Sequence, residues 1–165
     1  MEAFLKEIIW QQFGASIDML ENALAACPDK LWNTPEKFWY KAYHTLFWLD
    51  YYLSVDPKNF SPPAPFTLSE FDAGAALPEP AYSKTALLAY LAFGRKKCRD
   101  LIAGLPPDDT HLRFINDKKN YSITEILLYN MRHVQHHAAQ LNLLLRQAGY
   151  EPPHWVSRTK ESIEY

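Results

Sequence analysis

The sequence has only two cysteines, Cys27 and Cys98, and neither belongs to a Cys-x-x-Cys pair. Two isolated thiols predict reduced, structural cysteines in a reducing compartment, with a single disulfide as the less favoured alternative. The chain also lacks any run of about 20 apolar residues, the length that crosses a bilayer. Its first residues do not form a basic segment followed by an apolar one. We therefore expect a cytoplasmic protein with no membrane partner.

An excess of positive charge is also missing, because 17 Lys and Arg residues stand against 19 Asp and Glu residues and the net charge is -2. Basic residues adjoin one another mainly at positions 95–97 and 118–119. Binding to a phosphate backbone requires a basic patch, so we expect no nucleic-acid partner. Apolar residues, in contrast, make up 48% of the 165 residues and aromatic residues 15%, which is enough for one packed core. We expect a single domain over residues 1–165.

Apolar residues recur at steps of three and four along most of the chain, and little of it is typical of strands. The pattern predicts four long helices over residues 2–26, 35–55, 83–104 and 122–149. Thr34 is the expected N-cap of the second helix, with Pro35 at its first position. Ser122 and Glu125 form a capping box that starts the fourth. These features predict an all-α fold, a four-helix bundle.

Two connections are also distinctive. Residues 56–82 contain six of the twelve prolines and little apolar periodicity. A segment of this length can run back along a bundle as a crossover, which allows the second and third helices to point the same way. Residues 112–121 are expected to form a small hairpin that leads into the last helix.

Histidines on the predicted inward faces form a candidate metal site. His133 and His137 lie one turn apart on the last helix, where Cβ atoms are roughly 6 Å from each other. Helical phase places both on the inward stripe, together with Gln140 and Leu144. His44 lies within the aromatic stripe of the second helix and is the expected third ligand. Three neutral imidazoles with one open position suit Zn²⁺, Ni²⁺ or another borderline divalent ion.

Other interpretations of these residues stay open. A lone inward histidine is more often a hydrogen-bonded core residue than a ligand, and the pair on the last helix fits either role about equally. The three together favour a metal. His136 lies about 60° off the inward stripe, so it either flanks the ligands or faces solvent. Gln140 either supports the ligands from behind or is a core amide that bonds Tyr40 or Tyr51.

Side chains within a turn of the predicted ligands are expected to line a pocket, and they are Tyr40, Trp48, Tyr51 and Asn130. The aromatic stripe of the second helix is expected mainly to pack in the core and only secondarily to line a pocket. No inward Asp or Glu can be placed beside the three histidines. The sequence therefore identifies no general base, and the catalytic residues stay unassigned.

The inward His44, the motif His133-x-x-x-His137-x-x-Gln140 and the run LLRQAG at residues 144–149 resemble the DinB-like superfamily of metalloenzymes. The resemblance extends over most of the chain. It implies a bundle of up-down-down-up order, with the long crossover between helices two and three. It also implies a metal held by His44, His133 and His137. Many members have a basic residue and a glycine after the last histidine, whereas this chain has Ala138 and Ala139, which phase places away from the metal stripe.

Characterised members of that family include thiol S-transferases and a thiol-dependent isomerase. The resemblance therefore implies a metal-dependent transferase that acts on a small molecule, with a low-molecular-weight thiol as co-substrate. Metal coordination lowers the pKa of a bound thiol or water, so a hydrolase is the next alternative. The competing class is a non-catalytic metal-binding bundle that dimerises or holds a ligand. Related bundles often pair, which makes a homodimer a further expectation.

Overall fold

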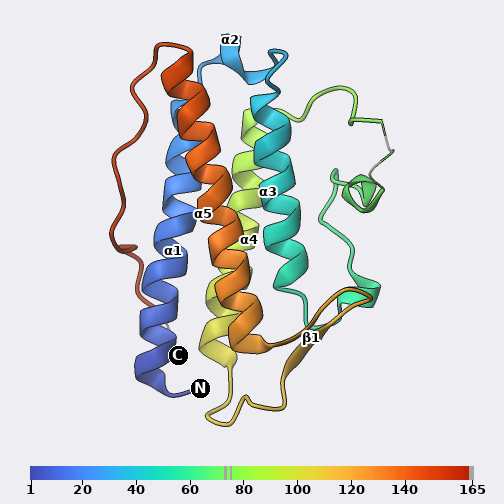
Figure 1. The fold of residues 1–165 in the computed structure, drawn as a ribbon, viewed down its shortest axis with the longest axis vertical. Helices are drawn as coiled ribbons and strands as arrows, with labels where there is room; N and C mark the ends of the chain where they lie inside the picture. The colour runs from blue at the N-terminus through green and yellow to red at the C-terminus, as the bar shows by residue number, and fades with distance from the viewer. Residues whose placement is uncertain (73, 75, 164–165) are drawn as a thin grey trace.

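The computed structural model describes residues 1–72, 74 and 76–163. These residues form five α-helices, two 3-10 helices and one two-stranded sheet, so the all-α prediction holds broadly. The long helices lie side by side (Figure 1) and are α1 (Ala3–Ala26), α3 (Phe38–Tyr52), α4 (Lys84–Gly104) and α5 (Ile123–Gln147). The short helix α2 (Asp29–Trp32) connects α1 to α3. No described helix is both long and apolar enough to cross a membrane.

The helices α4 and α5 each contact both α1 and α3. The core therefore fills the space among the four long helices. It is rich in aromatic side chains, and its largest fully buried members include Trp10, Phe13, Phe38, Tyr43, Phe47 and Tyr90. The contact between α3 and α5 matters most for function, because these two helices carry the candidate metal ligands.

The predicted helix starts are correct where a serine cap is present. The Ser83 side chain accepts a hydrogen bond from the Ala86 amide, and Ser122 accepts one from the Glu125 amide. The start predicted for the second helix is wrong. Thr34 donates to the Leu31 carbonyl and thereby closes α2, and α3 begins three residues after Pro35, behind Lys37 with φ of 51°.

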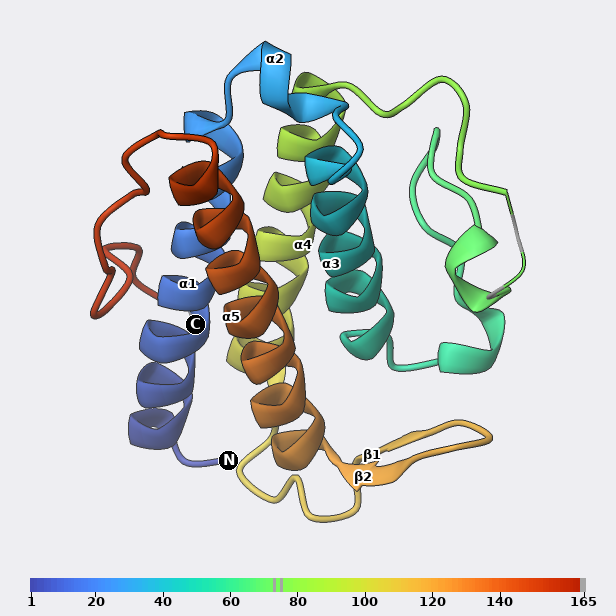
Figure 2. The ribbon, with the colours of Figure 1, turned by 45° about the horizontal axis from the view of Figure 1, so that its top comes forward.

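The segment between α3 and α4, residues 53–83, leaves one end of α3 and returns outside the bundle to the end where α2 lies (Figures 1 and 2). It contains the 3-10 helices η1 (Pro57–Asn59) and η2 (Ser69–Phe71). Aromatic contacts attach it to the core, since Phe66 stacks on both Tyr43 and Tyr90. Tyr43 also donates a hydrogen bond to the Thr67 carbonyl. These contacts hold η2 against the side of α3.

The predicted hairpin is present as strands β1 (Arg113–Ile115) and β2 (Asn120–Ser122). They pair antiparallel with Phe114 opposite Tyr121, and β2 runs directly into α5. Phe114 is buried against Tyr51 and Tyr52 of α3. The hairpin is therefore fixed beside the last turn of α3.

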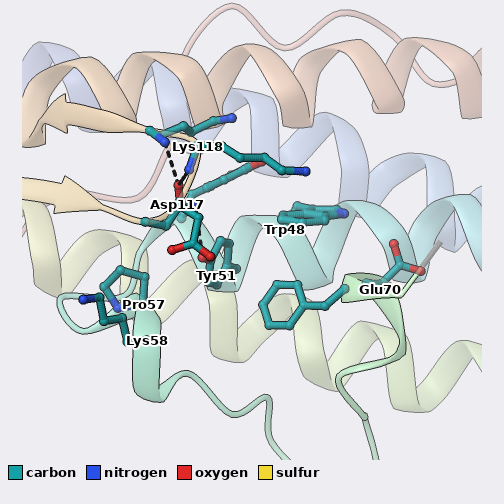
Figure 3. A pocket seen from close by; sticks show the side chains of 11 residues that line it. Trp48, Tyr51, Pro57, Lys58, Glu70, Asp117 and Lys118 are labelled. Atoms are coloured by element: carbon teal, nitrogen blue, oxygen red, sulfur yellow. Dashed lines mark hydrogen bonds between the residues drawn. The ribbon is translucent and has the colours of Figure 1, made fainter.

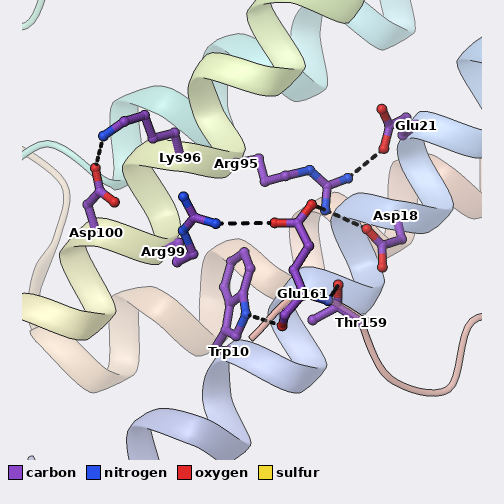
Figure 4. A network of polar contacts seen from close by, with 9 residues as sticks. All are labelled: Trp10, Asp18, Glu21, Arg95, Lys96, Arg99, Asp100, Thr159 and Glu161. Carbon is purple, nitrogen blue, oxygen red and sulfur yellow. Dashed lines mark hydrogen bonds and ion pairs between the residues drawn. The ribbon is translucent and has the colours of Figure 1, made fainter. Parts of the chain in front are cut away.

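Residues 148–163 run back along α1 (Figure 1), and polar contacts of Glu161 join them to α1 and α4 (Figure 4). The Trp10 indole donates to the Glu161 carbonyl, and the Glu161 carboxylate pairs with Arg95 and Arg99. Thr159 approaches α1 at Gly14, where an added Cβ would lie 2.5 Å from the threonine methyl. The chain after α5 is thus part of the packed body.

Candidate metal centre

The most deeply buried stripe of α5 does not contain the histidines. Val134, Ala138, Leu141 and Leu145 are fully buried, whereas His133, His137 and Leu144 are half-buried. The predicted inward stripe was centred about one residue too early, because α5 packs between α1 and α3 and buries a broad arc. The two histidines lie at the edge of that arc, on the side of α3. A half-buried edge leaves room for a ligand.

Three histidines meet at this edge. His44 of α3 and His133 and His137 of α5 each offer a ring nitrogen, and these atoms all lie within 4.8 Å of one another. The ring centroids are 5.5 Å apart for His44 and His133, 4.9 Å for His44 and His137, and 4.5 Å for His133 and His137. No other cluster of this kind occurs among the residues that the structure describes. The predicted ligand trio is therefore brought together.

A carboxylate lies behind His44, contrary to the expectation that none is near. Glu70 Oε2 is 2.6 Å from His44 Nδ1, and only 5% of the Glu70 side chain is exposed. A carboxylate accepts a hydrogen bond, so Nδ1 carries the proton and Nε2 keeps its lone pair. Glu70 belongs to η2 in the proline-rich crossover, where no helical period indicates which way a side chain points. Sequence reasoning therefore missed it.

An amide has the same role behind His137. Gln140 Oε1 is 2.8 Å from His137 Nδ1 and accepts its proton, while Gln140 Nε2 donates to His136 Nε2 at 3.0 Å. Of the two arrangements expected for Gln140, the structure has the amide bonded to the candidate ligand His137 and not to Tyr40 or Tyr51. His136 is exposed and lies at the flank, bonded to this amide.

His133 has a nitrogen without a protein partner. Its Nδ1 is buried and has no hydrogen bond to any described residue. A buried polar atom in this state is costly unless a ligand satisfies it. Burial, followed by the neighbouring His137 and His44, lowers the pKa of His133 to about 3. Burial likewise lowers the pKa of His137 to about 4, against the opposing effect of Gln140.

These properties fit a divalent cation. The lowered pKa values keep the imidazoles of His133 and His137 neutral at pH 7, which is the form that binds metal. Three imidazole donors with hydrogen-bonded partners behind two of them suit Zn²⁺ or a similar borderline ion. Binding of such an ion through Nδ1 would also satisfy the unpartnered nitrogen of His133.

The four residues predicted to line a pocket divide into two groups. Tyr40 and Trp48 contact the His44 ring, at centroid distances of 6.5 and 6.3 Å. Burial and a hydrogen bond to Glu70 raise the pKa of Tyr40 to about 12, so its hydroxyl stays protonated. Asn130 is instead fully buried and donates to the Leu49 carbonyl in the core. The expectation that Asn130 lines the site is therefore wrong.

Tyr51 lines a cavity of about 680 Å³ that lies beside the cluster (Figure 3). Its other walls come from α3, the crossover and the hairpin, and they are Trp48, Tyr52, Pro57, Lys58, Glu70, Phe71 and residues 116–119. Glu70 and Trp48 both contact His44 and also line this cavity. These two side chains therefore lie between the cavity and His44.

Comparison with known protein families gives one match. Residues 12–141 match the family model of the DinB superfamily. This range contains His44, His133, His137 and Gln140. No curated protein shows significant similarity to the chain.

Proposed function

The chain belongs to the DinB superfamily, and on this premise we propose that it is a metal-dependent enzyme. His44, His133 and His137 are the proposed ligands of one divalent ion, Zn²⁺ or Ni²⁺. The observation that carries the proposal is the convergence of three ring nitrogens within 4.8 Å from two helices. The lowered pKa values of His133 and His137 support it, because they keep both rings in the ligating form.

The residues around the ligands hold them in one orientation. Glu70 accepts the Nδ1 proton of His44 and Gln140 accepts that of His137, which leaves Nε2 of each ring free to bind. When bound, a divalent ion supplies Lewis-acid chemistry that lowers the pKa of a coordinated thiol or water. Burial and the neighbouring Glu70 keep the Tyr40 hydroxyl protonated beside the carboxylate that bonds His44.

Transfer to a low-molecular-weight thiol is the preferred reaction. The chain's own cysteines do not fit the role of nucleophile, because burial raises the pKa of Cys27 to about 11 and raises that of Cys98 as well. The thiol is therefore a co-substrate. Its sulfur forms a bond to an electrophilic carbon of a small molecule, the leaving group departs with its bonding electrons, and the thiol proton passes to solvent.

Hydrolysis is the second candidate, and Glu70 favours it. A carboxylate beside the site is a group that hydrolases use as a base. Its short hydrogen bond to His44 instead favours a role in positioning. We therefore rank hydrolysis below thiol transfer, and a non-catalytic metal-binding bundle below both.

A paired assay separates these candidates. The assay compares three zinc-loaded proteins, the parent, His137→Ala and His154→Ala. Each protein is incubated with monobromobimane and one thiol, which is cysteine, glutathione or coenzyme A. In parallel, each protein is incubated with p-nitrophenyl acetate. His154 is the control because it is exposed and lies outside the cluster. We expect thioether formation faster than the uncatalysed rate, with the acceleration requiring zinc and lost only in His137→Ala. Zinc-dependent ester cleavage alone would favour the hydrolase, and no turnover together with unfolding by a chelator would favour a structural site.

The order of the helices and the binding partners are part of the same proposal. We infer the up-down-down-up order, which is supported by the length of residues 53–83 and their course outside α3 (Figure 1). We propose a small-molecule substrate and no nucleic-acid partner, in keeping with the net charge of -2. A homodimer is proposed from the family resemblance, and sedimentation equilibrium tests it.

A further inference from the structure

Lysine side chains line the end of the cavity that lies beside the hairpin, away from Glu70. Lys58, Lys118 and Lys119 have no ion pair with any described residue. Lysines elsewhere do have such partners, since Lys84 pairs with Asp29, Lys96 with Asp100 and Lys97 with Asp50. The three ammonium groups at the cavity wall thus lack a direct ion pair, and within the part of the chain that the structure describes only Lys58 has a further carboxylate near it outside the cavity, Asp56. The pKa of Asp56 is lowered by the Asn59 side chain and also by the lysine's charge.

Lys119 is held in place by aromatic rings. Its ammonium lies 4.9 Å from the ring centroid of Tyr129, 5.8 Å from that of Tyr52 and 5.9 Å from that of Tyr121. Cation–π contacts of this kind favour the charged form of the amine and restrict its position. They leave its three N–H donors available for an acceptor.

The middle of the cavity is aromatic. The Trp48 ring stacks on Tyr52 at a centroid distance of 5.4 Å, and Phe71 lies 5.8 Å from Trp48 with 47% of its surface exposed. Tyr52 also contacts His133, at 6.1 Å between centroids. One tyrosine ring therefore separates the ammonium of Lys119 from the histidine cluster.

The acidic groups of the cavity do not cancel this charge at the hairpin end. Glu70 is bonded to His44 and Tyr40 at the other end, and Asp117 is exposed beside Lys118 at the rim (Figure 3). Three lysines thus face one free carboxylate. The volume of about 680 Å³ is in the range of small-molecule sites and too small for a folded partner.

We propose that the cavity binds a small organic anion. Its carboxylate or phosphate group lies at Lys118 and Lys119, its flat apolar body lies on Trp48, Tyr52 and Phe71, and its other end reaches the histidines. This inference rests on the proposed function, because it assigns the substrate class of the same site. Binding of the anion itself requires no metal.

The test measures binding to metal-free protein kept in chelator, at low salt, by calorimetry. The probes are 2-naphthoate, 2-naphthyl phosphate and the neutral 2-naphthamide. We expect both anions to bind at least about fivefold more tightly than the amide, because one partly exposed charge pair contributes about that factor to the affinity. Lys119→Gln and Lys118→Gln are each expected to weaken naphthoate about fivefold and to leave the amide unchanged. The exposed Lys160→Gln is the matched control and is expected to match the parent.

A second variant tests the apolar wall. Phe71→Ala, at an exposed ring, is expected to weaken naphthoate and naphthamide by the same factor. Equal affinity for anion and amide, or parental affinity in the Lys118→Gln, Lys119→Gln double variant, would overturn the inference. Zinc titration of the parent protein keeps the two proposals apart. A parent that takes up zinc but binds anion and amide equally rejects the anion site alone, whereas a parent that prefers the anions but takes up no zinc rejects the metal centre alone.

Discussion

Glu70 controls the orientation of His44, and its effect is measurable at the level of one residue. The carboxylate accepts from Nδ1 at 2.6 Å and so selects the tautomer with Nε2 free. Removal of a hydrogen-bond partner behind a metal-binding histidine typically lowers the affinity for the metal about 10- to 100-fold. We expect Glu70→Gln to weaken Zn²⁺ binding about tenfold, measured by competition with a chromogenic chelator.

Glu79→Gln is the matched control, because Glu79 is an exposed glutamate of the same crossover. It is expected to bind zinc as the parent does. Parental zinc affinity in both Glu70→Gln and Glu70→Ala, with normal circular dichroism, would show that the carboxylate does not position the ligand.

The two cysteines give a prediction about reactivity. With its pKa raised to about 11, the Cys27 thiol is ionised in only about one molecule in a thousand at pH 8, and Cys98 is fully buried. The pKa of each thiol is raised because burial disfavours the charged thiolate. We expect iodoacetamide at pH 8 to label the folded protein more than tenfold more slowly than protein in urea, as followed by mass spectrometry. Equal rates would mean that a chain thiol is available for chemistry.

Residue patterns in the sequence were sufficient to bring the three candidate ligands together but not to predict their surroundings. The four-residue spacing of His133 and His137, and the position of His44 in an aromatic stripe, bring the same three residues together as the structure does. Glu70 and Lys119 lie outside the long helices, in a crossover and a hairpin. Their contacts depend on tertiary packing, which helical phase does not describe.

At the scale of secondary structure, the helix that carries two of the candidate ligands, α5, begins at a capping serine. The Ser122 side chain accepts from the Glu125 amide at the helix start. Loss of such a cap costs about 1 kcal/mol. We expect Ser122→Ala to lower the unfolding free energy by about that amount and the melting temperature by about 2–4 °C.

Ser157→Ala, at an exposed serine outside any helix, is expected to leave the melting temperature unchanged. A Ser122→Ala protein as stable as the parent would mean that water replaces the cap without loss. Caps also explain which helix starts were predicted. Ser83 and Ser122 mark α4 and α5 correctly, whereas Thr34 bonds backward to Leu31 and marks the end of α2.

At the scale of the whole molecule, the segment after α5 contributes to stability. Ile163 is only 7% exposed and belongs to the main core, although it lies beyond the last helix. Truncation of a buried isoleucine to alanine costs about 2–5 kcal/mol. We expect Ile163→Ala to destabilise the protein by about 2 kcal/mol in urea unfolding.

Ile115→Ala is the control, since Ile115 is 48% exposed in β1, and we expect a change below about 0.5 kcal/mol. Equal effects of the two substitutions would show that the tail does not pack on the bundle. The course of this tail was not predicted, because residues 150–163 have no helical or strand period and attach through single side chains such as Trp10 and Arg95.

The central claim is that three histidines from two helices hold one divalent ion. Its most direct test is equilibrium dialysis of metal-stripped protein against Zn²⁺, with elemental analysis of the parent, His44→Ala, His133→Ala, His137→Ala and the exposed His154→Ala. Circular dichroism checks that each variant is folded. We predict one zinc per chain in the parent and in His154→Ala, and none in the other three. A parent that takes up no zinc, or folded His44→Ala and His137→Ala proteins that retain it, would contradict the account.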